Sequence, residues 1–486
     1  MASRLKPPNS RYFFSPPLQK PTNKPPHLFP HLPKSLSIPH NDTKIPPGPT
    51  EKLIINGGSK LSGHVNISGS KNSALSILAA TLCCSGTSKL TNVPYLSDTR
   101  TMASVLESLG AEVEFCGNEF VVSTDGISSV EPDSDSVGKI RGGFFVIGPL
   151  VARFGEAIVG LPGGCDIGSR PVDIYIRGLR ALGAIVELRD GKVQAYAANG
   201  KGLVGGRFQL DFPSVGATET LMMAASLAKG QTVLSNVAQE PEVIDLAHFL
   251  MNCGASIRGA GSKELHINGK DRLHGSCYSI IPDRIEAGSF MLAAAITRSC
   301  ISLSPIFPSY LSCLIEKLLG AGCKIVQCTR DNLELSAIPG IFGDDLQGFD
   351  IKTRPFPGFP TDLQPQTMAF LSTCNGKSIV EESVFENRMN HVKELRKLGL
   401  RIQVCGSTAL ISGKERGRGS PIYGSRVAAT NLRGGMSLVL AGLAAEGITE
   451  ISGISHIDRG YENLEKKLQI LGANVKRLNP RPNLVQ

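Results

Sequence analysis

One pattern of apolar and polar residues recurs along the chain from residue 51 onward. A segment with helical periodicity ends at Leu-Gly-Ala or a close variant, and a stretch of alternating polarity, typical of a half-buried strand, follows it. The glycines of this pattern lie 68 to 77 residues apart. They are Gly110, Gly183, Gly254, Gly322, Gly399 and Gly472. Because glycine adopts the left-handed conformation at little cost, we interpret each as a helix stop.

Six copies at near-constant spacing predict a repeated module. Each unit is too long for a solenoid repeat and fits a small module of two helices and several strands. Six such modules make two α/β domains of three modules each, with a cleft between them that suits a small-molecule site. The alternative is that Leu-Gly-Ala is only a common helix stop, which explains a single copy but not the regular series.

The net charge of the chain comes mainly from its N-terminal segment. The chain has 486 residues and a formal charge of +9. Residues 1–50 hold seven Lys or Arg and one acid, so the remainder is nearly neutral. A nearly neutral body has no electrostatic track for a polyanion, which argues against nucleic acid as a partner.

Other features exclude further classes of protein. The twelve cysteines form no C-x-x-C pair and no Cys/His spacing of a zinc site, so we expect free thiols and no metal. No apolar run reaches the roughly 18 residues that a membrane-spanning helix needs. We expect no organic cofactor either.

The segment 1–50 differs in composition from the rest. It contains 13 of the 31 prolines, several serines and no hydrophobic periodicity, so we expect it to be disordered. Basic, hydroxylated and acid-poor N-terminal segments resemble organelle transit peptides. Because the proline density disfavours the amphipathic helix usual for mitochondria, we predict a plastid (chloroplast stroma) and the plastid import machinery as a partner. The alternative is a simple disordered tail.

A first candidate for chemistry is the Gly-rich turn at residues 67–75, which leads into an apolar helix. Lys71 and Asn72 stand at the start of that helix, where unpaired backbone N–H groups and a lysine favour an anion. The alternative is that Lys71 is a solvated residue of the first turn.

A second candidate is the loop at residues 161–173. Cys165 lies among glycines and polar residues, and Arg170 could lower the pKa of its thiol. A loop cysteine of this kind can add covalently to a substrate or deliver a proton, whereas a lone cysteine would more often be inert.

The sequence Gly-Gly-Cys-x-Ile-Gly-x-Arg-Pro-Val-Asp of this loop resembles the signature of UDP-N-acetylglucosamine 1-carboxyvinyltransferases, the first committed enzymes of peptidoglycan synthesis. The resemblance covers essentially all of residues 51–480. Further matching motifs are Arg141 with residues 148–155, Phe212–Glu219, Phe359–Gln364, Val384–Arg388, Leu432-Arg433 and His456–Glu462.

The resemblance implies the enolpyruvyl-transferase fold, with two inverse α/β barrel domains of three modules each, in agreement with the repeat. In that family the N-terminal strand crosses to the second domain. We therefore expect a discontinuous domain of residues 51–70 plus 282–486 and an inserted domain of residues 71–281 that carries the Cys165 loop.

The resemblance also implies the substrates, phosphoenolpyruvate and UDP-N-acetylglucosamine, and a role for each matching residue. Lys71, Arg170 and Arg459 match phosphate clamps, and Arg433 fits a contact with the carboxylate. Cys165 matches a proton donor that also forms an adduct with phosphoenolpyruvate, and Asp362 matches a carboxylate near the sugar hydroxyl, a general base. Positions around the phosphoenolpyruvate or the nucleotide sugar are Asn72, Arg141, Arg170, Pro171, Val172, Asp173, Ile174, Phe212, Ser214, Val215, Asp362, Val384 and Arg388.

Three features depart from the family pattern. Asn431 stands where aspartate is usual, and it cannot hold charge or accept a proton. Phe212 replaces a lysine of some relatives, and residues 413–426 resemble a short basic insertion. Two other functions therefore stay open: enolpyruvyl transfer to another acceptor such as shikimate 3-phosphate, and a catalytically weak binding or scaffold protein.

We predict that fosfomycin, an electrophilic epoxide, alkylates Cys165, because a thiol activated by a nearby arginine is nucleophilic. Intact-mass spectrometry should show one added fosfomycin on the wild type and none on Cys165→Ser. An equal mass shift in both proteins would place the reactive group elsewhere.

Overall fold

The computed structural model describes residues 51–164, 167–168, 171–200, 202–338, 345–414 and 422–479. Cys165 and Arg170 lie outside the described residues, as do the predicted transit peptide and half of the predicted basic insertion, residues 415–421. Within the described part, no helix has the length and apolarity needed to cross a membrane.

The described residues form two hydrophobic cores. One, here called the N core, gathers buried side chains between Ala74 and Ile280. The other, the C core, combines Leu53–Ile67 with side chains between Ile285 and Val475. The predicted boundaries at 70/71 and 281/282 stay a prediction, and they fall in the two intervals where one core gives way to the other.

The two connections between the cores lie beside each other. Gly69 and Pro282 form an isolated antiparallel bridge. The Ser70 N–H donates to the Ile281 carbonyl at 2.7 Å, and the Asp283 N–H donates to the Ser68 carbonyl at 2.8 Å. The chain therefore leaves the C core and returns to it through one hydrogen-bonded pair of extended segments.

The helices divide into six inner and seven outer ones among the described residues. The helices of the N core are α1 (Lys71–Ala80), α2 (Ser97–Ser108), α3 (Ser134–Lys139), α4 (Ile147–Phe154), α5 (Asp173–Ala181), α6 (Val215–Ser226) and α7 (Pro241–Asn252). Those of the C core are α8 (Arg284–Ile296), α9 (Ser312–Ala321), α10 (Gln364–Leu371), α11 (Val392–Lys397), α12 (Leu432–Ala444) and α13 (Leu464–Ile470). Helices α1, α4 and α6 of the N core and α8, α10 and α12 of the C core are largely buried, and their sequences are mostly apolar.

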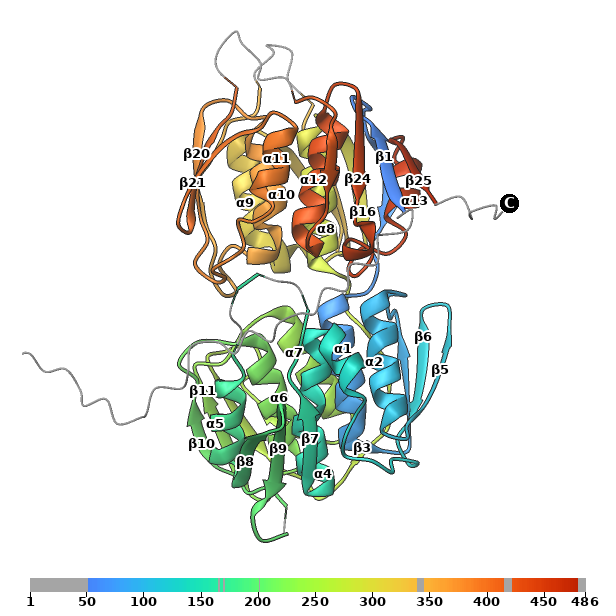
Figure 1. Cartoon of the computed structure of the whole chain (residues 1–486), viewed down its shortest axis with the longest axis vertical. Helices are drawn as coiled ribbons and strands as arrows, with labels where there is room; N and C mark the ends of the chain where they lie inside the picture. Colours follow the sequence, from blue (N-terminus) through green and yellow to red (C-terminus); the bar gives the residue numbers. More distant parts are fainter. Residues whose placement is uncertain are drawn as a thin grey trace, which may run out of the picture. The chain divides into compact units, whose positions relative to one another are not determined.

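Three small sheets accompany each set of inner helices (Figure 1). In the N core they are β15(Cys277–Ser279)-β4(Thr87–Thr91)-β6(Glu119–Ser123)-β5(Glu112–Cys116), β7(Glu156–Gly160)-β9(Lys192–Ala197)-β8(Ala184–Arg189) and β10(Arg207–Gln209)-β11(Gln231–Ser235)-β13(Glu264–Asn268)-β12(Ser256–Arg258). In the C core they are β17(Lys324–Thr329)-β18(Asn332–Ser336)-β16(Cys300–Ser304)-β2(Ser62–Asn66), β19(Ile351–Lys352)-β20(Lys377–Glu381)-β22(Thr408–Ser412)-β21(Arg401–Cys405) and β23(Arg426–Ala428)-β24(Ile448–Ser452)-β1(Lys52–Asn56)-β25(Asn474–Leu478). A short pair, β14(Leu273–His274)-β3(Cys84–Ser85), completes the N core.

The predicted repeat of six modules, three to each half, is confirmed. All six glycines of the Leu-Gly-Ala pattern have positive φ, between +82° and +107°. Each follows an outer helix and precedes an edge strand, which is β5, β8, β12, β17, β21 or β25. Helices lie inside and sheets outside, as the inverse arrangement requires, although the described strands form separate open sheets and not a closed barrel.

Candidate active site

A single cavity of about 430 Å³ draws its walls from both cores. Most of the residues selected from the sequence line it. They are Lys71, Asn72, Arg141, Pro171, Ile174, Phe212, Ser214, Val215, Asp362, Val384, Arg388, Arg433 and Arg459. Val172 and Asp173 are not among the lining residues, and Asp173 instead pairs with Arg177 on the exposed face of α5 at 3.2 Å. The fold therefore brings together residues that are up to 388 positions apart in the chain.

The repeat explains why these residues meet. Each of the six inner helices begins at the cavity, so its first turn, or the turn just before it, supplies lining residues. These are Lys71 and Asn72 for α1, Arg141 and Gly142 before α4, Ser214 and Val215 for α6, Arg284 for α8, Asp362 before α10, and Leu432 and Arg433 for α12. Helix N-termini carry partial positive charge, so their convergence favours anionic ligands.

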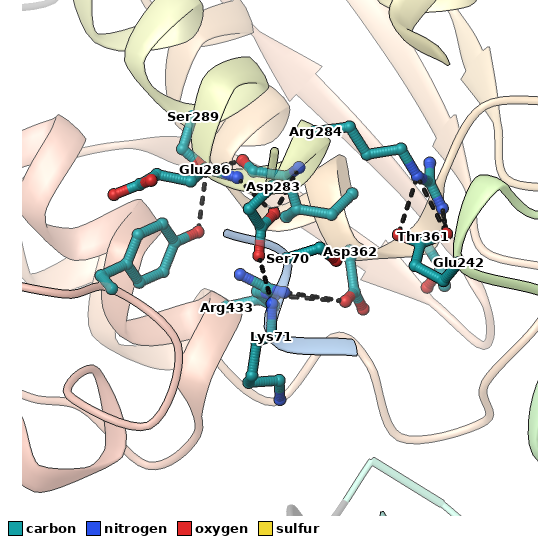
Figure 2. A network of polar contacts seen from close by, with 12 residues as sticks. Ser70, Lys71, Glu242, Asp283, Arg284, Glu286, Ser289, Thr361, Asp362 and Arg433 are labelled. Carbon is teal, nitrogen blue, oxygen red and sulfur yellow. Dashed lines mark hydrogen bonds and ion pairs between the residues drawn. The ribbon is translucent and has the colours of Figure 1, made fainter. Parts of the chain in front are cut away.

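Lys71 is fixed at the start of α1 by the connection between the cores. The Ser70 hydroxyl caps the helix by accepting from the Ser73 N–H at 3.4 Å. The backbone N–H of Lys71 donates to Asp283 Oδ2 at 3.1 Å, as Figure 2 shows. Both contacts fix the backbone at this point. The side chain of Lys71 therefore extends from a fixed position at the cavity wall.

Asp98, which the sequence reasoning missed, joins two of the predicted clamp cations. Its side chain is 4% exposed and lies in the first turn of α2. Lys71 Nζ lies 3.4 Å from Asp98 Oδ2, and Arg459 Nε donates to Asp98 Oδ1 at 2.8 Å. Lys71 belongs to the N core and Arg459 to the C-core segment before α13, so a single carboxylate holds one cation from each half.

Asp362 joins two further cations. Arg388 Nη2 donates to Asp362 Oδ1 at 2.7 Å. Arg433 Nε donates to Asp362 Oδ2 at 3.2 Å (Figure 2). Burial acts to raise the pKa of Asp362, but the charges of Arg433, Arg388 and Lys71 outweigh it and hold the pKa well below its ordinary value. Asp362 is therefore ionised at neutral pH, and it is a weak base as long as both guanidinium groups stay paired with it.

The two departures from the family pattern that the structure describes have local explanations. Asn431 caps α12, because its Oδ1 accepts from the Gly434 N–H at 2.8 Å, a role that asparagine performs as well as aspartate. Phe212 lines the cavity and is 40% exposed, so it offers an aromatic face where a lysine would offer charge.

A group of acids on the cavity wall was also missed. Glu219, Glu240 and Glu242 line the cavity together with Arg284, which donates to Glu242 through Nε at 3.0 Å and Nη2 at 3.2 Å (Figure 2). Burial raises the pKa of Glu219 well above its ordinary value, and the nearby Glu242 raises it further. The sequence signal for Glu219 was a lone acid inside the apolar helix α6.

The donor set does not suggest a metal centre. Among the described residues, no group of three or more His, Cys, Asp or Glu side chains is arranged to hold an ion. In the cavity, cations are instead paired with the acids that neutralise them. This arrangement suits binding of an anion and transfer of a proton.

Comparisons with known proteins agree with this geometry. Residues 55–468 match the family model described as EPSP synthase (3-phosphoshikimate 1-carboxyvinyltransferase). The UDP-N-acetylglucosamine 1-carboxyvinyltransferase 2 of Carboxydothermus hydrogenoformans is 48% identical over 429 residues, which cover 88% of this chain and 100% of that relative. The UDP-N-acetylglucosamine 1-carboxyvinyltransferase of Gloeobacter violaceus is 49% identical over 429 residues, 88% of this chain and 91% of the relative. Among solved structures, the enolpyruvyl transferase NikO from Streptomyces tendae superimposes with a TM-score of 0.78 at 26% identity, over 90% of this chain and 100% of the other.

We predict that Asp98→Asn destabilises the free protein, because it leaves Lys71 and Arg459 close together without their shared counter-charge. The expected loss is on the order of 2 kcal/mol of unfolding free energy. Inorganic phosphate should then raise the melting temperature of Asp98→Asn more than that of the wild type, because the added anion replaces the missing carboxylate. Thermal unfolding with and without phosphate measures both effects.

Asp345→Asn is the matched control, since Asp345 also joins two cations, Arg298 at 2.7 Å and Lys414 at 2.9 Å, but does not line the cavity. Phosphate should not rescue this variant. If it stabilises both variants equally, Asp98 does not mark an anion site.

Proposed function

The chain belongs to the family of UDP-N-acetylglucosamine 1-carboxyvinyltransferases, and we propose that it performs this family's reaction inside a plastid with the cavity described above. It transfers the enolpyruvyl group of phosphoenolpyruvate to the 3-hydroxyl of UDP-N-acetylglucosamine and releases phosphate. The observation that carries the assignment of the site is the convergence of Lys71, Arg433 and Arg459 around Asp98 and Asp362 in one cavity.

The donor substrate is a small molecule with two anionic groups, a phosphate and a carboxylate. Lys71 and Arg459 already face a common anion, Asp98, so they are arranged to hold the phosphate. Arg433 presents a guanidinium that can pair with the two oxygens of a carboxylate. Because these groups come from both cores, the full set of contacts exists only while the two halves hold the ligand between them.

The reaction has an addition step and an elimination step. The 3-oxygen of the sugar bonds to C2 of phosphoenolpyruvate while its proton leaves and a proton is added to C3. The C2–O bond to phosphate then breaks, and a proton leaves C3 to restore the double bond. We assign the hydroxyl proton to Asp362 and the C3 proton to Cys165, which lies outside the described residues.

The pairing of Asp362 has a consequence for the first step. An ionised carboxylate with a lowered pKa accepts a hydrogen bond from the sugar hydroxyl but draws off its proton poorly. When Arg433 turns to the carboxylate of the donor, Asp362 loses one of the charges that lower its pKa. Binding of the donor would thereby make Asp362 a stronger base at the moment when a base is needed.

The N-terminal segment supports the proposed location. Residues 1–50 carry seven basic residues against one acid, and the match to the family model begins only at residue 55. A segment outside the matched region with this composition suits import into an organelle.

A turnover assay with two acceptors tests the reaction. We expect phosphate release from phosphoenolpyruvate with UDP-N-acetylglucosamine and none above background with shikimate 3-phosphate. Cys165→Ser should lower the rate about a hundredfold or more, the range usual for loss of a general acid. Turnover of shikimate 3-phosphate would favour the other acceptor. Tight binding of UDP-N-acetylglucosamine without phosphate release would favour a non-catalytic descendant.

A fusion of residues 1–50 to a fluorescent protein tests the location. We expect the fusion to accumulate in plastids of plant cells, and a fusion of residues 51–486 to stay outside them. A cytosolic signal from both fusions, or a mitochondrial signal from the first, would contradict the plastid proposal.

A further inference from the structure

Two glutamates that line the cavity each have one buried carboxyl oxygen without a hydrogen-bond partner in the described part of the chain. Glu219 is 1% exposed and Glu240 is 9% exposed, and both line the cavity. Glu219 Oε1 and Glu240 Oε2 have no hydrogen-bond partner among the described residues. A buried polar atom without a partner costs stability, so a ligand that supplies one recovers that cost.

The surroundings of these two oxygens disfavour an anion as their ligand. Glu242 lies close enough to both glutamates to raise their pKa, and its own charge is matched by Arg284. Burial raises the pKa of Glu219 well above its ordinary value, which favours its neutral form, and burial also raises the pKa of Glu240, so that Glu240 is protonated more readily than a free glutamate. A neutral carboxyl group can donate one hydrogen bond and accept others, which suits hydroxyl and amide groups.

The position of this wall relative to the cations suggests which part of a substrate it meets. Asp362 lies within electrostatic reach of Lys71 and also of Arg284. In Figure 2, Asp362 lies between Lys71 and Arg433 on one side and Arg284 with Glu242 on the other. A sugar whose hydroxyl approaches Asp362, with the anionic donor against the cations, would therefore extend toward the glutamates.

We propose that the unpartnered oxygens of Glu219 and Glu240 form a subsite for the uncharged hydroxyl and amide groups of the acceptor sugar, with Glu219 as a specificity-determining residue. This inference rests on the proposed function, because it takes UDP-N-acetylglucosamine to be the acceptor. The wall favours a neutral, hydrogen-bonding pyranose over a phosphorylated or carboxylated ring, because its carboxyl groups offer hydrogen bonds and its cation, Arg284, is already paired with Glu242.

Calorimetric binding of two probes, UDP-N-acetylglucosamine and UDP, tests the subsite in the wild type, Glu219→Gln and Glu219→Leu. Glu219→Leu should weaken binding of UDP-N-acetylglucosamine about tenfold, as the loss of a hydrogen bond between uncharged groups predicts, and leave binding of UDP unchanged. Glu219→Gln keeps a donor and an acceptor, so it should stay within about threefold of the wild type. In turnover, the KM for UDP-N-acetylglucosamine should rise in Glu219→Leu while the KM for phosphoenolpyruvate stays constant.

Thr220→Val is the matched control, because Thr220 is the next residue of α6, is fully buried, and has an unpartnered Oγ1, but does not line the cavity. This variant should bind both probes as the wild type does. Equal loss of UDP and UDP-N-acetylglucosamine binding in Glu219→Leu, or no loss of either, would overturn the subsite.

An error in the subsite and an error in the proposed function would give different experimental results. If the wild type turns over UDP-N-acetylglucosamine but Glu219→Leu binds it as tightly as the wild type, only the subsite is wrong. If the wild type binds neither probe and releases no phosphate, the proposed function and the subsite are both wrong.

Discussion

The site depends on holding like charges close together in a partly buried space. Lys71, Arg388, Arg433 and Arg459 converge on one cavity, and without counter-charges their repulsion and desolvation would oppose folding. Two carboxylates resolve the conflict by each pairing with two cations. Because Asp98 takes one partner from each core, the same ion pairs that neutralise the cavity also tie its two walls together.

The six-module architecture explains how such a cavity arises from a repeat. A helix that is buried along its whole length still has a first turn whose N–H groups need partners. Six inner helices that begin at one place gather these turns around a shared space, so each module contributes a small piece of the site. The modules differ in the residues at these helix starts, for example a lysine at the start of α1 and an aspartate before α10. The repeated scaffold therefore encloses a site whose walls carry different chemical groups.

Much of this arrangement could be predicted from the sequence. Leu-Gly-Ala predicted the helix stops because a left-handed turn favours glycine. The Gly-rich turn before an apolar helix pointed to Lys71, and the family resemblance pointed to Arg433. The partners of those cations could not be predicted, because Asp98 meets Arg459 across 361 residues of chain and only the packing decides that contact. The position of Glu219 at the cavity could not be predicted for a related reason. The sequence does not reveal which face of a wholly buried helix borders a cavity.

The position of strand β1 in the chain affects the order in which the two cores can fold during synthesis. It pairs with β24 and β25, so the first of the described strands in chain order finds its neighbours only in the last two. The N core is formed by one contiguous stretch of chain, so its folding does not depend on β24 and β25. The N core can therefore fold before the C core is complete, and both edges of β1 lack their native partners until β24 and β25 have been synthesised, which favours non-native pairing in the meantime.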